Sequence, residues 1–390
     1  MKTLNEGSRL TVFLEGRIDT NNARQTEEEI FAAAGGFSGE IVLDAGGLAY
    51  ISSAGLRVLM RLRKSVNSSI KIINTSSEVY EIFETTGFSE LFEVSRRMRE
   101  LSVEGCEIIG RGQFGTVYRT DPETIVKVYA SPDSLPMIRN ETELAKTALL
   151  AGVPTAIAYD IVRVGDSYGS VFELLNARTL NDLLTDNTDD ADGVIRQYAE
   201  FLKLVNSQTV PAGKLRSARE RSLGYLDTAA KYLDGGLERR LRQLISEVPE
   251  QLNVIHGDAQ MKNIMVVDGE PMLIDMDTLS QGHPIFELQA VYVTYFAFGE
   301  DDPNNSMEFL GIPKAVSDRV WERFAGYYSG SGDEAVISSL KDKIALAGSV
   351  RFLYLIDMIT DHGSELFRTR VDRTVKRLGE LAERVESLAF

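Results

Sequence analysis

Cysteine, histidine and long hydrophobic runs are scarce in this sequence. The single cysteine, Cys106, excludes a disulfide framework, and three histidines make a Cys/His zinc site a poor prospect. The longest apolar runs, such as residues 291–298, are far shorter than a membrane span. The first residues, MKTLNEGSRL, lack the apolar segment of a secretion signal. We therefore expect a cytoplasmic protein with no membrane segment.

Basic residues are also outnumbered by acidic ones. The chain has 42 Lys and Arg against 58 Asp and Glu, which gives a net charge of −16 at pH 7. Such a surface repels phosphate backbones and anionic lipid, so nucleic acid and membrane surfaces are not expected partners. The other proportions, 43% hydrophobic and 26% charged residues in a chain of 390, are those of a globular protein with about two or three domains.

The hydrophobic pattern changes along the chain near residue 97. Before it, short strands alternate with short helices, which predicts a small α/β layer with a mixed or parallel sheet. Asn21 and Ser53 are expected to cap two of the helices. The charged stretch 95–100, SRRMRE, marks the boundary between domains 1–97 and 98–390. The predicted elements are strands over 10–14, 40–43 and 69–73, and helices over 21–34, 53–66 and 77–86.

The larger part changes pattern again. Residues 103–129 suggest two or three antiparallel strands, and the chain beyond Ala177 is mainly helical apart from a β-like stretch over 253–274. The last predicted helix, 365–388, carries an apolar stripe at helical spacing, which we attribute to packing.

A glycine-rich segment opens the larger part. Ile109 to Arg119 reads IGRGQFGTVYR and places Gly110, Gly112 and Gly115 in the spacing GxGxxG, followed by Val117. Both flanks resemble strands, so the loop joins a hairpin and does not open a helix as in dinucleotide-binding folds. The hairpin is typical of a kinase loop whose backbone N–H groups approach phosphates, although an ordinary glycine turn has the same spacing.

A lysine follows within an apolar strand. Lys127 in IVKVY needs a carboxylate or phosphate partner if it is buried, whereas on an edge strand it would extend to solvent. The helix expected over 137–150 offers Glu141 and Glu143, and a lysine held by a helix glutamate is the kinase arrangement for phosphate binding. We favour Glu141, with Glu143 as the alternative.

The most specific pattern lies in residues 254–277, VIHGDAQMKNIMVVDGEPMLIDMD. Phosphoryl transfer from ATP needs a carboxylate that accepts the proton of the attacking hydroxyl, and oxygen ligands that hold Mg²⁺ against the phosphates. Asp258 suits the first role, and Asn263 with Asp275 the second. An aspartate buried in the apolar hairpin, as expected for Asp275, is hard to explain without a cation. The alternative is that Asp258 and Asn263 only stabilise a turn.

Residues from about 100 to 390 resemble the aminoglycoside phosphotransferase and choline kinase branch of the protein-kinase-like fold. The motifs GRGQFG, VKVY, HGDAQMKN and LIDMD carry this resemblance. It implies an α+β bilobal fold, with an N-lobe over 98–175 and a C-lobe over 176–390, that uses ATP and Mg²⁺. It also implies a hinge over 172–175, in which Glu173 and Leu175 make backbone hydrogen bonds to adenine. The nucleotide would further contact Gly110, Gly112, Gly115, Val117 and Lys127.

The sequence departs from that branch after Asp275 and at Glu287, and the length of the segment between them bears on the kind of acceptor. Met276 and Asp277 follow Asp275 where a DFG triplet has phenylalanine and glycine, and Glu287 stands where the branch usually has aspartate. Gly257 replaces the arginine that clamps a phosphorylated activation loop. Only residues 276–286 separate Asp275 from Glu287, too few for a peptide platform, which favours a small-molecule hydroxyl or amine as acceptor.

Two acidic clusters could attract a cationic acceptor, although runs of this kind are often only solvated loops. They comprise Asp186, Asp189, Asp190 and Asp192 in one stretch, and Glu300, Asp301 and Asp302 in the other.

The first 97 residues resemble the STAS domain of anti-sigma factor antagonists. The stretches GRIDTNNA, EIVLDAGGLAYISSAGLRVL and ETTGFSELFEV carry the resemblance. In that family a serine at the start of the second helix is phosphorylated by a partner kinase, and Ser53 falls on this position. The resemblance implies a regulatory domain with a protein partner and, for the whole chain, bacterial signalling. Ser53 is either this phosphoacceptor or only a helix cap.

Two functions follow from the sequence. The first is an ATP- and Mg²⁺-dependent phosphotransferase for a small molecule, with a regulatory STAS domain. The second is a signalling or scaffold protein whose kinase-like domain binds nucleotide or phosphorylates Ser53 of a STAS domain. The sequence does not identify the acceptor, the partner or the oligomeric state.

Overall fold

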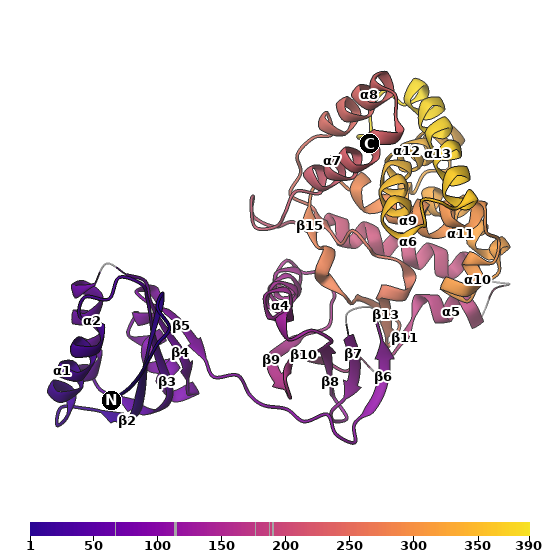
Figure 1. Ribbon diagram of the computed structural model, residues 1–390. Helices are drawn as coiled ribbons and strands as arrows, with labels where there is room; N and C mark the ends of the chain where they lie inside the picture. The colour runs from indigo at the N-terminus through magenta and orange to yellow at the C-terminus, as the bar shows by residue number, and fades with distance from the viewer. Residues whose placement is uncertain (67, 113–114, 176, 187, 189–190) are drawn as a thin grey trace. The chain divides into compact units, whose positions relative to one another are not determined.

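The computed structural model describes residues 1–66, 68–112, 115–175, 177–186, 188 and 191–390. These residues form two compact units, Met1–Ser102 and Val103–Phe390 (Figure 1). Among the described helices, none combines the length and the apolarity that a bilayer crossing requires.

The smaller unit is an α/β layer, which confirms the fold class expected for it. Its sheet has the order β1-β2-β3-β4-β5, with β1 antiparallel to β2 and the other neighbours parallel, so the sheet is mixed. In β2 the buried Leu10, Val12 and Leu14 alternate with more exposed residues, as a strand with one face on a core requires. The elements are β1 (Lys2–Asn5), β2 (Arg9–Ile18), α1 (Ala23–Ala34), β3 (Glu40–Ile51), α2 (Ser53–Ser65), β4 (Ile70–Thr75), α3 (Ser77–Thr85), η1 (Phe88–Glu90) and β5 (Glu93–Arg96).

The predicted helix caps of this unit were wrong by one residue. Ser52, in extended backbone geometry, is the N-cap of α2, and its hydroxyl accepts from the amides of Ala54 and Gly55 at 3.2 and 3.5 Å. Ser53 is already helical and its side chain is exposed. At α1 the N-cap is Asn22, whose side chain makes no capping bond because it binds Arg17 O and Asp19 N. Capping therefore does not occupy the Ser53 hydroxyl.

This assignment predicts different effects for the two neighbouring serines. Ser52→Ala removes a cap, which costs about 1 kcal/mol, so the amides of α2 should exchange with solvent about fivefold faster. Ser53→Ala should leave their exchange nearly unchanged. Hydrogen exchange of peptides from residues 53–65 in the intact protein measures both. Equal acceleration in the two variants would contradict the assignment of Ser52 as the cap.

The first lobe of the larger unit is an antiparallel sheet of order β6-β7-β8-β10-β9, with helix α4 beside it (Figure 1). The antiparallel strands expected within 103–129 are β6, β7 and β8. The apolar residues Ile138, Ala145 and Ala148 of α4 are buried, and the helix packs against β9 and β10. The elements of this lobe are β6 (Glu107–Arg111), β7 (Gly115–Arg119), β8 (Thr124–Tyr129), η2 (Pro132–Ser134), α4 (Leu135–Leu150), β9 (Ala158–Val164) and β10 (Ser167–Glu173).

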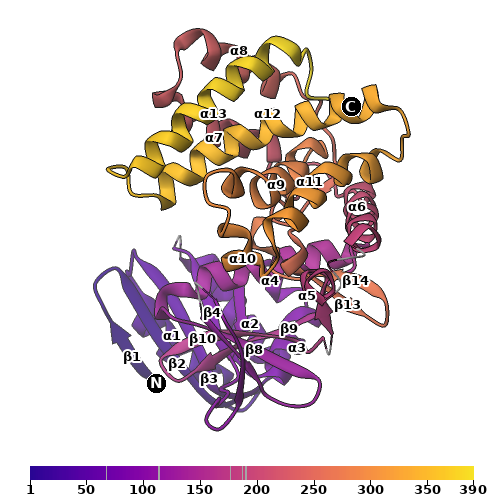
Figure 2. The same cartoon turned by 90° about the vertical axis from the view of Figure 1, so that its right-hand side faces the viewer.

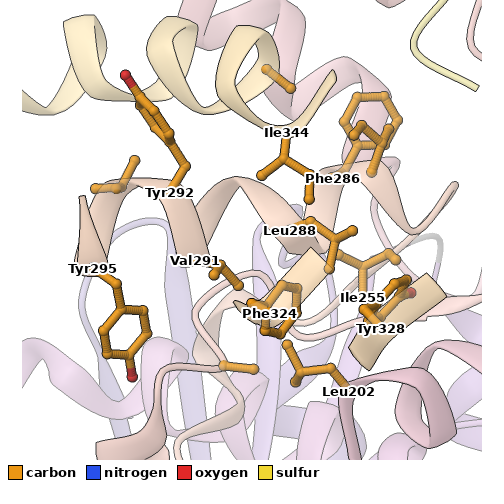
Figure 3. Packing of buried hydrophobic residues seen from close by; sticks show 14 of the residues in the cluster. Leu202, Ile255, Phe286, Leu288, Val291, Tyr292, Tyr295, Phe324, Tyr328 and Ile344 are labelled. Atoms are coloured by element: carbon orange, nitrogen blue, oxygen red, sulfur yellow. The ribbon is translucent and has the colours of Figure 1, made fainter. Parts of the chain in front are cut away.

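The second lobe is mostly helical, so the larger unit has the expected α+β bilobal fold. Helix α9 is buried on all sides between α12, α11 and α7, as its mostly apolar sequence favours (Figure 3). Helices α12 and α13 lie side by side (Figure 2). The helices are α5 (Leu180–Asp186), α6 (Ala191–Ser207), α7 (Ala218–Ala229), η3 (Ala230–Tyr232), α8 (Gly235–Ser246), η4 (Met261–Asn263), η5 (Met276–Thr278), α9 (Ile285–Tyr295), η6 (Ala297–Glu300), α10 (Asn305–Leu310), α11 (Lys314–Ser329), α12 (Glu334–Ile359) and α13 (Glu365–Arg384).

Short strands place the central motif between these helices. The hairpin β13–β14 pairs with β11, and β12 pairs with β15, both in antiparallel register. The strands are β11 (Arg178–Thr179), β12 (Val254–Ile255), β13 (Ile264–Val267), β14 (Glu270–Leu273) and β15 (Ser280–Gln281). The loop between β12 and β13 and the residues after β14 therefore meet at one place.

Candidate active site

Lys127 lies between two carboxylates from distant parts of the chain. Its Nζ is 2.9 Å from Oε1 of Glu141 and 3.2 Å from Oδ1 of Asp275. Glu141 points from α4 toward β8, whereas Glu143 is exposed and pairs only weakly with Lys146 at 4.0 Å. The other Glu141 oxygen accepts a hydrogen bond from the hydroxyl of the buried Tyr129. Strand β8, α4 and the end of β14 thus meet at one lysine.

The charge state of this lysine follows from its neighbours. Burial disfavours the ammonium, but the carboxylates of Glu141 and Asp275 outweigh it and raise the pKa of Lys127 above its ordinary value. Burial and the same glutamate raise the pKa of Tyr129, which therefore stays a hydrogen-bond donor. Lys127 is a fixed cation that is available to an anionic ligand.

The glycine segment forms a tight hairpin next to this lysine. Gly115 pairs with Tyr129 in the sheet, and a Cβ there would overlap Val128 O, so only glycine fits. The amide of Gly112 donates to Gly115 O at 2.9 Å, and Gly110 lies opposite Val117. Val117 is in turn the register partner of Lys127. Residues 113 and 114 lie outside the described residues.

The segment predicted as a hinge follows β10. The amide of Glu173 donates to Ile157 O at 3.0 Å, so only the carbonyl of Glu173 remains for an adenine contact. Leu175 O accepts from the amide of Ala177 at 2.9 Å, and Leu175 N has no hydrogen-bond partner in the described part of the chain. The two residues thus offer an acceptor and a donor, and residue 176 is not among those described.

The loop after β12 carries Asp258 and Asn263. The side-chain amide of Asn263 donates to the backbone carbonyl of Asp258 at 2.8 Å, and its nitrogen lies 3.3 Å from Asp258 Oδ2. Asn263 O accepts from the amide of Ile274 at 3.0 Å, so Asn263 sits beside the start of the Asp275 turn. Asp275 is not buried as its apolar hairpin suggested. Its left-handed backbone, with φ of 66°, turns it out of the strand and leaves its side chain 46% exposed.

The donor atoms at this place suit a divalent cation of the magnesium type. No group of three His, Cys, Asp or Glu side chains forms a metal site among the described residues. Magnesium needs fewer protein ligands, since it is commonly held by one or two carboxylates together with substrate phosphates and water. Partial burial, together with the negative charges of Asp275 and Glu141, raises the pKa of Asp277 to about 6. The carboxylates of Asp275, Asp277 and Glu141 thus repel one another. A cation would reduce this repulsion, so the residues fit the ion.

Glu287 holds the Asp258 loop in place, a role that its sequence position did not reveal. Its carboxylate has no exposed surface and accepts from the amides of His256 and Gly257 at 2.6 and 2.9 Å. Asn206 adds a third donor at 3.4 Å. Because α9 is buried on all sides, Glu287 is fixed relative to the core and fixes the loop in turn. Glutamate, in place of the aspartate that the resembling branch usually has here, thus still binds the backbone of the Asp258 loop.

Two arginines from separate helices lie on the same loop, and sequence motifs gave no sign of either. Arg351 of α12 donates to Gly257 O at 2.6 Å and lies 3.4 Å from Asp258 Oδ1. Arg221 of α7 donates to Thr278 O and, at 2.9 Å, to the Ser280 hydroxyl. Its guanidinium lies where a Cβ of residue 257 would be, and φ of 85° at Gly257 also requires glycine. Gly257 therefore makes room for Arg221.

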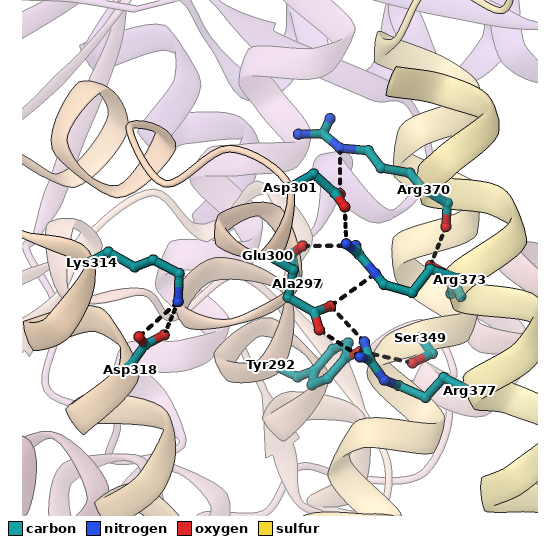
Figure 4. A network of polar contacts seen from close by, with 11 residues as sticks. Tyr292, Ala297, Glu300, Asp301, Lys314, Asp318, Ser349, Arg370, Arg373 and Arg377 are labelled. Carbon is teal, nitrogen blue, oxygen red and sulfur yellow. Dashed lines mark hydrogen bonds and ion pairs between the residues drawn. The ribbon is translucent and has the colours of Figure 1, made fainter. Parts of the chain in front are cut away.

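Four of the described residues of the acidic clusters, Asp186, Asp192, Glu300 and Asp301, form ion pairs with arginines, which disfavours their use in binding a cationic acceptor. Glu300 pairs with Arg373 and Arg377, and Asp301 pairs with Arg370 and Arg373, all from one face of α13 (Figure 4). In the other cluster Asp186 pairs with Arg178 at 2.7 Å and Asp192 with Arg319 at 2.9 Å. Asp189 and Asp190 lie outside the described residues. Asp302 caps the following turn by accepting from Asn304 N.

Comparison with known proteins matches the two units to two families. The model of the phosphotransferase enzyme family matches residues 106–326, and that of the STAS domain matches residues 2–101. The "Putative anti-sigma factor antagonist BtrV" of Bordetella bronchiseptica is 37% identical over 89 residues, which cover 22% of this chain and 77% of that protein.

Two solved structures resemble the chain at low identity. A choline/ethanolamine kinase family protein from Mesorhizobium loti is 16% identical, with a TM-score of 0.45, over 71% of this chain and 88% of that one. A thermostable aminoglycoside phosphotransferase APH(4)-Ia, in a ternary complex with ADP and hygromycin B, is 13% identical, with a TM-score of 0.49, over 79% and 98%.

Proposed function

We propose that the chain, which belongs to the phosphotransferase enzyme family through residues 106–326, is an ATP- and Mg²⁺-dependent phosphotransferase for a small molecule. A STAS domain of the anti-sigma factor antagonist type precedes the matched region. The acceptor group is a hydroxyl or an amine, and the STAS domain is regulatory. The observation that carries the proposal is the convergence of Lys127, Glu141 and Asp275, with Asn263 and Asp258 on the adjoining loop.

Each residue has a task in this proposal. Lys127, oriented by Glu141, binds the phosphates of ATP, and the hairpin of Gly110, Gly112 and Gly115 with Val117 covers the nucleotide. Adenine binds at Glu173 and Leu175. Asn263 and Asp275 would hold Mg²⁺, which when bound neutralises charge on the phosphates. Asp258 accepts the proton of the acceptor group while that group attacks the γ-phosphate and ADP leaves.

The fold after Asp275 favours a small acceptor over a peptide. Residues 276–278 form a single 3₁₀ turn, β15 then pairs with β12, and α9 begins at Ile285. The backbone of this segment is thus used inside the lobe, so it offers no extended edge on which a substrate peptide could lie.

The direct test is ATP turnover by the intact protein with a panel of small hydroxyl and amine compounds, alongside calorimetry of Mg·ATP binding. Transfer of phosphate to a compound of the panel is the expected result. A protein that binds Mg·ATP but transfers phosphate to no small molecule, in a panel that includes a fractionated cell extract, would favour the scaffold function.

Ser53 supports a second candidate function, phosphorylation of a STAS domain by the kinase-like unit. Ser53 is exposed at the first position of α2, and its hydroxyl makes no hydrogen bond within the described residues. A phosphate there would be stabilised by the helix N-terminus. The deciding measurement is intact-protein mass after incubation with Mg·ATP. One added phosphate that is absent from both Ser53→Ala and Asp258→Asn supports this function, and an unchanged wild-type mass excludes it under those conditions.

A further inference from the structure

A cavity of about 1040 Å³ lies within the larger unit, and one of its lining residues, Arg221, contacts the Asp258 loop. Its walls come from α4, from residues 212–217 and the first turn of α7, from residues 249–252, and from residues 277–283. Arg221 is the lining residue that reaches the loop, because its guanidinium lies against Gly257, the neighbour of Asp258. A ligand that binds Arg221 in this cavity would therefore be separated from Gly257 of the Asp258 loop by that side chain.

Basic side chains outnumber acidic ones by one in the cavity lining. Arg219 pairs with Glu250, so these two charges cancel. Lys214 and Arg216 are exposed, and neither side chain has a hydrogen-bond or ion-pair partner among the residues that the structure describes. The remaining lining residues of opposite charge are Glu220 on the exposed first turn of α7, and Asp277 beside the candidate metal site.

Arg221 has no carboxylate within ion-pair distance among the described residues. Its two hydrogen-bond acceptors there, Thr278 O and the Ser280 hydroxyl, are uncharged and use only two of its five N–H groups. Burial and the nearby charge of Arg351 lower the pKa of Arg221 from its ordinary value, whereas the carboxylates of Glu287 and Asp277 partly oppose this effect. An oxyanion could accept hydrogen bonds from the remaining N–H groups.

Arg351 adds a second guanidinium on the same loop. It binds Gly257 O and lies 3.4 Å from Asp258 Oδ1, and its side chain is only 11% exposed. Arg221 and Arg351 thus both contact the Asp258 loop, and Arg351 forms an ion pair with Asp258 itself. In the acidic clusters, Asp186, Asp192, Glu300 and Asp301 are paired with arginines elsewhere.

We infer that the acceptor carries a phosphate or carboxylate group, which binds in the basic cavity at Arg221 and Arg216 while the acceptor hydroxyl lies at Asp258. This inference rests on the phosphotransferase function proposed above and specifies its substrate class. A polycationic acceptor would be repelled by the same residues. The basic cavity is defined here by Lys214, Arg216, Arg219 and Arg221.

Four compounds with the same propanediol skeleton test this charge preference: glycerol 3-phosphate, glycerate, glycerol and 3-amino-1,2-propanediol. Their binding to the intact protein is measured by protein-observed NMR titration without nucleotide. Glycerol 3-phosphate should bind at least about tenfold more tightly than glycerol, because charge-assisted hydrogen bonds are stronger than neutral ones. Glycerate should bind more tightly than glycerol, and the amine most weakly. The preference for the two anions should shrink as salt is raised.

Variants locate the binding. Arg216→Gln and Lys214→Gln remove exposed side chains that have no partner to lose, so folding should be preserved, and each should weaken glycerol 3-phosphate binding about fivefold. Arg242→Gln is the matched control, since Arg242 lies on α8 outside the cavity lining and pairs with Asp227 and Glu238. It should leave binding unchanged.

The inference is overturned if the four compounds bind alike, if the amine binds most tightly, or if Arg216→Gln and Lys214→Gln bind glycerol 3-phosphate like the wild type. Calorimetry of Mg·ATP on the same samples separates the two proposals. Failure to bind Mg·ATP would overturn the phosphotransferase function and the inference with it. Normal Mg·ATP binding without charge preference would overturn the inference alone.

Discussion

Asp258→Asn is expected to slow phosphate transfer about 10²- to 10⁴-fold, the usual effect of removing a general base, while Mg·ATP binds with nearly unchanged affinity. The substitution keeps the shape of the side chain and its place between Arg351 and Asn263, which lie 3.4 and 3.3 Å from its two oxygens. It removes the negative charge that accepts the proton. The measurement is the transfer rate to an accepted compound, with Mg·ATP affinity by calorimetry.

Asp268→Asn is the control for this substitution. Asp268 is exposed at the tip of the β13–β14 hairpin and has a positive φ of 51°, which asparagine tolerates. This variant should transfer phosphate at the wild-type rate. A near-wild-type rate for Asp258→Asn would show that another group takes the proton.

Asp275→Asn is expected to weaken Mg²⁺-dependent ATP binding by at least about 100-fold, because the loss of a second-shell partner of a metal already costs 10- to 100-fold. Asparagine is chosen over alanine since position 275 has a left-handed backbone. The same change removes one of the two carboxylates that hold Lys127. The Mg²⁺ dependence should thus be lost first, and some Mg²⁺-independent nucleotide binding should remain.

Calorimetric titration of ATP with and without Mg²⁺ measures this effect. Asp268→Asn again serves as the control and should bind Mg·ATP like the wild type. If Asp275→Asn binds Mg·ATP as tightly as the wild type, the metal is held elsewhere.

Local patterns indicated much of the architecture but less of the site. The change of hydrophobic period indicated an α/β layer followed by an α+β lobe pair, and the structure and the family matches confirm both. Glu141 lies on the face of α4 that carries Ile138 and Ala145. Because Glu143 is within one helical turn of Glu141, the sequence alone did not exclude Glu143 as the partner of Lys127. The cap of α2 shifted by one residue because two serines adjoin, and only the backbone geometry of Ser52 separates them.

The contacts that hold the Asp258 loop depend on tertiary structure. Arg351 reaches Asp258 across 93 residues of sequence, and no motif links the two. Glu287 had been singled out by position, yet its role depends on a helix that is buried on all sides. The neutralised acidic cluster did leave a signal, since Arg370, Arg373 and Arg377 recur at helical spacing and so predict a basic face on α13.

The most direct test of the account follows the γ-phosphate itself. The intact protein is incubated with Mg²⁺, γ-labelled ATP and the small-molecule fraction of a cell extract, and the products are separated by charge and mass. Label is expected in a small compound other than inorganic phosphate, and this label should be lost in Asp258→Asn but not in Asp268→Asn. Label that stays in ATP, or that passes only to water or to the protein, would contradict it.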